Sequence, residues 1–166
     1  MKILSAVVCF ALVGVMPIAF EIGSAKGNQK MNRTEKAVKF IKSDTLPPSV
    51  GYSQAVTVRS GSLVYVAGQV AMDPSGKLVG LGDFRAQAEQ IFENLKAALA
   101  ASGTSFDNVV KLNSYFVDIK QAPVFREVRD KYINVTHPPV STAVEVRGLV
   151  REEWLLEVEA IAVVPE

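Results

Sequence analysis

The feature that most constrains the fold is the last apolar run of the chain, residues 154–163, which is typical of a β-strand with apolar residues on both faces. Every second residue from Leu156 onward is apolar, and the opposite face mixes Ile161 and Val163 with two glutamates. A sheet that is apolar on both faces must be covered on both. Helices cover one face, so a second copy of the chain most simply covers the other. We therefore expect a homo-oligomer.

The remaining patterns predict two helices among strands, in the order β-β-β-α-β-α-β-β. Asp83 is a good N-cap, and apolar residues follow it at spacings of three and four until Gly103 ends the helix. Residues 123–132 predict a second, shorter helix. The predicted strands are residues 38–41, 54–59, 62–71, 109–117, 141–146 and 154–163. Ser60-Gly61 is a turn signal, so the second and third strands are expected to form a hairpin.

The first 25 residues have the features of a secretory signal peptide. Residues 3–20 carry no charge, and small residues precede a cleavage position after Ala25. An uncleaved N-terminal anchor is the alternative, because this apolar run approaches the length that spans a bilayer. Pro17 and the small residues at the end of the run favour cleavage. The mature protein is then expected in the periplasm or outside the cell, without membrane attachment.

Behind the signal peptide, residues 26–36 are polar and show no apolar periodicity, which predicts a linker. The folded domain is therefore predicted as residues 37–166. Its length suits one domain of ordinary size.

The residue counts exclude several classes of function. The chain has one cysteine, which lies in the signal peptide, and one histidine, so a structural zinc site, a disulfide or a catalytic triad is not expected. We expect no metal and no cofactor. The 18 Lys and Arg residues against 17 Asp and Glu residues leave a net charge of +1. Nucleic acid is not expected as a partner, because phosphate binding needs a clustered cationic excess.

Several short motifs together resemble the Rid family, also called the YjgF family, over about residues 38–164. In chain order they are GYSQAV (51–56), VYVAGQ (64–69), the helical stretch 87–95, VVK (109–111), PVSTAVEV (139–146) and LEVEAIA (156–162). The resemblance implies a chorismate-mutase-like α+β subunit, with a mixed sheet and two helices packed on one face. It also implies a homotrimer with ligand clefts between neighbours, and hydrolysis of reactive enamines and imines to keto products with release of ammonia.

The resemblance also implies which residues form the cleft. In the deaminating members an arginine before the Ser-Thr-Val strand binds the substrate carboxylate, a glutamate on the last strand positions water, and a tyrosine lines the cleft. Backbone groups near a Gly-Gln turn complete it. Carried over by position, the glutamate is Glu157, the tyrosine is Tyr52 and the turn is Ala67-Gly68. The position of the arginine is occupied by Val140.

Val140 removes the group that would hold a substrate carboxylate. A guanidinium makes two charge-assisted hydrogen bonds of about 1.5–3 kcal/mol each, so its loss weakens binding by about two to four powers of ten. Arg147 lies an odd number of residues away and faces the other side of a regular strand. Arg129, on the second predicted helix, is the better substitute, although an ordinary solvated helix residue is the simpler interpretation.

The other carboxylate to consider is Glu159, which shares a strand face with Glu157. Burying both as anions is costly, so one of them is expected to have a raised pKa or a cationic partner. Two interpretations remain open. Either Glu157 positions water, or both glutamates are charges at the rim of the cleft.

The sequence thus predicts an exported homotrimer that binds a small metabolite in clefts lined by Tyr52, Gly68, Val140 and Glu157, and that is not an efficient imino-acid deaminase. The alternative is an enamine or imine deaminase whose substrate lacks a carboxylate or uses Arg129. A second alternative is a chaperone-like holdase, which requires a large exposed apolar patch.

Overall fold

A computed structural model describes residues 37–166. The predicted signal peptide and linker lie outside the described residues. Within residues 37–166, no helix is both long enough and apolar enough to cross a membrane.

Both predicted helices are present, and local capping explains where the first one begins and ends. α1 (Phe84–Ala101) begins after Asp83, whose side chain accepts a hydrogen bond from the backbone N–H of Ala86 at 3.1 Å. Gly103 follows its end with a φ of +78°, which favours glycine. α2 (Ala122–Arg129) ends three residues before the prediction. The chain turns there, and Tyr132 still packs against the core from outside the helix.

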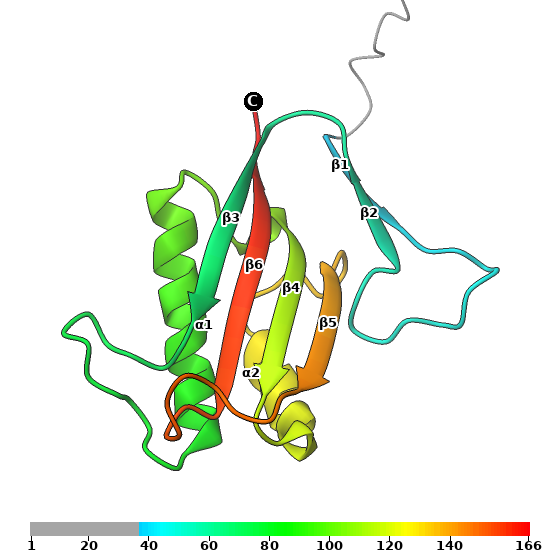
Figure 1. Cartoon of the computed structure of the whole chain (residues 1–166). Helices are drawn as coiled ribbons and strands as arrows, with labels where there is room; N and C mark the ends of the chain where they lie inside the picture. Colours follow the sequence, from blue (N-terminus) through cyan, green and yellow to red (C-terminus); the bar gives the residue numbers. More distant parts are fainter. Residues whose placement is uncertain (1–36) are drawn as a thin grey trace, which may run out of the picture. The chain divides into compact units, whose positions relative to one another are not determined.

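Four strands form one mixed sheet, and both helices pack on the same face of it (Figure 1). The strand order is β3 (Ser62–Gln69), β6 (Leu156–Val164), β4 (Val109–Phe116) and β5 (Val140–Glu145). β6 is antiparallel to both of its neighbours, whereas β4 and β5 are parallel. Two short 3₁₀ turns, η1 (Phe106–Asn108) and η2 (Ile119–Gln121), lie on either side of β4. The predicted α+β fold with a mixed sheet is confirmed.

The core fills the space between this sheet and the two helices. Phe92 of α1 packs against Phe125 of α2, and Phe125 in turn meets Phe116 of β4 edge to face at 5.1 Å between ring centroids. Alternate residues of β4 and β6 are fully buried on this side, among them Leu112 and Val158. The residues between these buried positions therefore point to the opposite side of the sheet.

The predicted hairpin between the second and third strands is wrong. β2 (Ala55–Val58) pairs with β1 (Val38–Ile41) in a separate antiparallel sheet, and β3 pairs with β6. Figure 1 shows β1 and β2 on the β5 side of the main sheet, with β3 at its opposite edge. Gly61 turns the chain between β2 and β3, with a φ of +94°. It packs against the end of β6, where a Cβ on this residue would lie 2.5 Å from the carbonyl oxygen of Val164. The turn signal is real, but the turn joins two sheets.

A contact distant in sequence holds the β1–β2 pair in this place. The backbone N–H of Ser53 donates to the carbonyl of Pro139 at 3.1 Å, and its hydroxyl donates to the carbonyl of Pro138 at 2.6 Å. The start of β2 is thereby attached to the loop that leads into β5. This attachment brings Tyr52 close to the first residue of β5.

Candidate functional site

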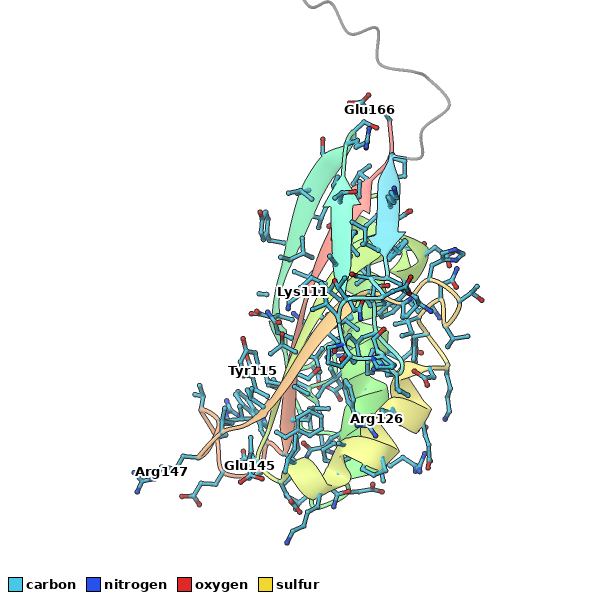
Figure 2. The ribbon with its side chains drawn as sticks, turned by 90° about the vertical axis from the view of Figure 1, so that its right-hand side faces the viewer. Lys111, Tyr115, Arg126, Glu145, Arg147 and Glu166 are labelled. Carbon is cyan, nitrogen blue, oxygen red and sulfur yellow. The ribbon has the colours of Figure 1, made fainter. Side chains whose placement is uncertain are left out.

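The side of the sheet away from the helices, called the open face below, carries most of the polar side chains of the strands. Residues that are paired in register on neighbouring strands point to the same side. Figure 2 shows Lys111 and Tyr115 on the side of the sheet opposite to the helices. The open face includes Tyr65 of β3, Glu157, Glu159 and Ile161 of β6, Lys111, Asn113 and Tyr115 of β4, and Thr142 and Val144 of β5.

Glu157 and the Ala67-Gly68 turn, which the resemblance named as site residues, meet on this face. A register shift between Val66 and Gln69 places the turn opposite β6. A Cβ added to Gly68 would overlap Oε1 of Glu157, and its three nearest atoms would all belong to that side chain. The carboxylate therefore lies directly against the backbone of Gly68. Among residues 37–166, no group donates a hydrogen bond to Glu157, so both of its oxygens keep acceptor capacity.

Glu159 has different surroundings. Its Oε1 accepts a hydrogen bond from Asn113 Nδ2 at 2.6 Å and another from the Tyr115 hydroxyl at 3.2 Å. Neither Glu159 nor Glu157 makes an ion pair within the described part of the chain. The cationic partner that a buried pair would need is thus not supplied by residues 37–166 of the same copy. Two neutral donors fix Glu159 instead.

Tyr115 connects the two glutamates and was missed by the sequence analysis. It stands opposite Glu157 in register, and its hydroxyl donates to Glu159. Burial, together with the charges of both glutamates, raises the pKa of Tyr115 above its ordinary value. The available signal was the alternation of Lys111, Asn113 and Tyr115 along the predicted strand, which puts three polar residues on the face opposite to the core.

A second group of predicted site residues gathers where β2 and β5 begin. Gly51, with a φ of +75°, lies against the guanidinium of Arg129, where a Cβ would be 2.8 Å from Nη2. Tyr52 follows it and is 40% exposed. Arg129 is only 6% exposed, and its Nε donates to Oδ1 of Asp130 at 2.8 Å. The interpretation of Arg129 as a solvated helix residue is therefore wrong.

One copy of the chain does not bring the two groups together. Val140 is paired in register with Lys111, whereas Glu157 is level with Tyr115 and, through it, with Val144. Four residues of a strand separate the two levels, which is about 13 Å. Tyr52, Arg129 and Val140 thus form one half of the predicted cleft, and Gly68 and Glu157 form the other.

Other parts of the described chain offer less chemistry. No group of three or more His, Cys, Asp or Glu residues within residues 37–166 is arranged to hold a metal ion. A cavity of about 630 Å³ lies beside the start of α1, but none of the predicted site residues lines it. Its two carboxylates, Asp83 and Asp118, already accept hydrogen bonds from backbone N–H groups at the starts of α1 and η2.

Comparisons with known proteins agree with this architecture. A model of the family described as Endoribonuclease L-PSP matches residues 42–164. Protein DfrA of Myxococcus xanthus is 41% identical over 76% of this chain and 96% of its own length. A 2-iminobutanoate/2-iminopropanoate deaminase of Dermatophagoides farinae is 33% identical over 76% of this chain and 96% of its own.

Among solved structures, a protein of the Rid family from Yersinia pestis, YyfB, has a TM-score of 0.69 and 32% identity. The match covers 77% of this chain and 99% of that one. The motifs, the mixed sheet with its two helices and the matched family model thus lead to the same conclusion: the chain belongs to the Rid family, also called the YjgF family.

Proposed function

We propose that this Rid-family protein binds a small metabolite in clefts between the copies of a homotrimer, and that it does not deaminate imino acids efficiently. The observation that carries the proposal is the absence of an arginine from β5, whose residues are Val140 to Glu145. An aliphatic side chain at Val140 gives a substrate carboxylate neither a charge nor a hydrogen-bond donor.

Arg129 does not restore this function on its own. Its guanidinium is buried against Gly51 and bonded to Asp130, so binding a second carboxylate requires the loop around Gly51 to move. Packed loops of this kind resist small displacements, because a neighbouring side chain must shift as well.

The assembly is proposed for two reasons. The halves of the predicted cleft lie about 13 Å apart along the strands in one chain, so a neighbouring copy is needed to complete it. The open face also leaves apolar side chains in solvent, including Leu63, Tyr65 and Val144, which are 47%, 72% and 41% exposed. Leu63 and Tyr65 lie two residues apart on one face of β3, and exposed apolar side chains gathered in this way favour an interface.

The compartment is proposed from the sequence alone. Residues 1–25 are taken as a cleaved signal peptide, residues 26–36 as a linker and residues 37–166 as the mature domain. The protein then acts in the periplasm or outside the cell, on metabolites that reach that compartment.

The test follows an imine directly. An amino-acid oxidase converts L-alanine to 2-iminopropanoate, and semicarbazide traps the imine as a semicarbazone that is measured by absorbance. We expect the wild-type chain to leave semicarbazone formation unchanged. Val140→Arg should reduce it if the rest of the cleft is intact, whereas Val150→Arg, on a side chain that is 88% exposed, should not. Suppression by the wild-type chain would overturn the proposal.

That outcome would favour the second candidate, an enamine or imine deaminase. Glu157 lies against the backbone of Gly68, and no group within residues 37–166 donates to either of its oxygens, which leaves them able to accept a proton from water. The similar protein from Dermatophagoides farinae carries the name of such an enzyme. If the wild-type chain is a deaminase and suppresses semicarbazone formation, Glu157→Gln should abolish that suppression. If it is not, Glu157→Gln should leave semicarbazone formation unchanged.

A further inference from the structure

A second pocket lies on the open face, separate from the carboxylate of Glu157. It has a volume of about 330 Å³ and spans β3, β6 and β4. The residues that carry its chemistry are Tyr65, Ala67, Lys111, Asn113, Glu159 and Ile161. It therefore places a cation, an anion, an amide and an apolar wall around one small space.

The two charges in this pocket are held in place but not neutralised. Lys111 Nζ donates to the hydroxyl of Thr142 at 2.7 Å, which draws it toward β5. Glu159 is bound by Asn113 and Tyr115. All of these partners are neutral, and no ion pair within residues 37–166 involves Lys111 or Glu159. Each charged group is thus positioned for a ligand of opposite charge.

The register shows why the two charges do not simply meet each other. Lys111 pairs with Ile161, and Glu159 pairs with Asn113, so the charges are diagonal neighbours on β4 and β6, roughly 7–8 Å apart at the backbone. Lys111 Nζ is drawn toward Thr142 on β5, whereas Glu159 lies on β6. Asn113, which stands in register between Thr142 and Glu159, bonds the Glu159 carboxylate. A gap between opposite charges remains.

We propose that this pocket binds the zwitterion of an α-amino acid. The carboxylate of the ligand meets Lys111, its ammonium group meets Glu159, and an apolar side chain lies against Tyr65 and Ile161. A simple carboxylic acid is disfavoured because Glu159 repels it, and a simple amine is disfavoured because Lys111 repels it. Charge-assisted hydrogen bonds at both ends give the zwitterion the advantage.

The ligand also resolves a difficulty with the assembly. If another copy covers the open face, Lys111 and Glu159 lose water without gaining an opposite charge, which is costly. A bound zwitterion matches both. The amino-acid site itself does not depend on the proposed function, since neither Val140 nor Glu157 takes part in it.

The test compares three probes that differ by one group: L-valine, 3-methylbutanoate, which lacks the amine, and isobutylamine, which lacks the carboxylate. Isothermal titration calorimetry at low ionic strength measures the Kd of each probe for the full chain. We expect L-valine to bind about ten- to hundredfold more tightly than either partial probe. Equal binding of L-valine and 3-methylbutanoate, or no binding of L-valine, would overturn the proposal.

Two substitutions assign the ends of the ligand. Glu159→Gln should weaken L-valine about ten- to hundredfold and leave 3-methylbutanoate unchanged or tighter, whereas Lys111→Met should weaken L-valine and spare isobutylamine. Glu152→Gln and Lys120→Met, on exposed side chains, are the matched controls and should change nothing. A variant that does not fold binds none of the three probes and lacks the circular dichroism spectrum of the folded chain. In that case the proposal is tested by the binding of the three probes to the wild-type chain. Loss of every probe by a folded variant would contradict the assignment. Imine hydrolysis is measured separately, so either proposal can fail without the other.

Discussion

The contact between Gly68 and Glu157 can be tested by adding one methyl group. In Gly68→Ala the new Cβ would overlap Glu157 Oε1 and lie 2.8 Å from Cδ and 3.0 Å from Cγ, well inside the usual contact distance of about 3.5–4.0 Å. The three atoms nearest to this Cβ all belong to Glu157, so this side chain has to move first. Forcing it into a poorer rotamer costs about 0.5–1.5 kcal/mol.

Urea denaturation at one fixed protein concentration measures this cost, because the stability of an oligomer depends on concentration. Gly148→Ala is the matched control, since a Cβ there meets nothing within 4 Å, and it should change stability by less than about 0.5 kcal/mol. In Glu157→Ala/Gly68→Ala the obstacle is gone, so the two substitutions should couple by about 1 kcal/mol. Coupling below about 0.3 kcal/mol would show that Glu157 does not rest on Gly68.

Two further predictions concern α2 and the turn behind it. Arg129→Met should lower the free energy of unfolding by about 1–3 kcal/mol, because Asp130 loses its partner and the loop at Gly51 loses its support, whereas Arg126→Met, on an exposed side chain of the same helix, should have little effect. Urea denaturation of both variants checks this, and equal effects would contradict it. Burial and the hydrogen bond to Glu93 raise the pKa of Tyr132 to about 12 from its ordinary value of 10.0. The neutral phenol is thus favoured in the folded state, so its contribution to stability is complete below pH 10 and is lost as the pH rises to about 12. Unfolding measured across this window should be less pH-dependent in Tyr132→Phe, and an unchanged slope would refute the assignment.

The parts of the fold that depend on local sequence were predicted well. Asp83 and Gly103 set the limits of α1 because capping is decided within a few residues. The partner of β2 was not predicted, because it is decided by contacts distant in sequence. Ser53 bonds to Pro138, 85 residues away, and this contact directs β2 away from β3. A turn signal predicts only that the chain turns. It does not predict with which strand the next segment pairs.

The same distinction applies to the candidate site. The structure brings Glu157 and Gly68 together, and both could be named from the sequence because a family resemblance carries the pairing of distant strands with it. The burial of Arg129 was missed, since nothing in the helix itself shows that the loop at Gly51 covers its end. Tyr115 was missed because its place between the glutamates depends on the register of β4 against β6.

That register also separates the roles of two glutamates that sequence alone treats as equivalent. Both lie on one face, two residues apart, and the expected conflict was between two buried anions. Asn113 and Tyr115 fix Glu159 with neutral donors, so its charge stays available to a cationic ligand group at the level of Asn113. Glu157 has no donor within residues 37–166 and rests on the backbone of Gly68, so its oxygens remain free to accept from water or a ligand. One strand thus carries two carboxylates with different surroundings, and Asn113 and Tyr115 of β4 make that difference by bonding to Glu159.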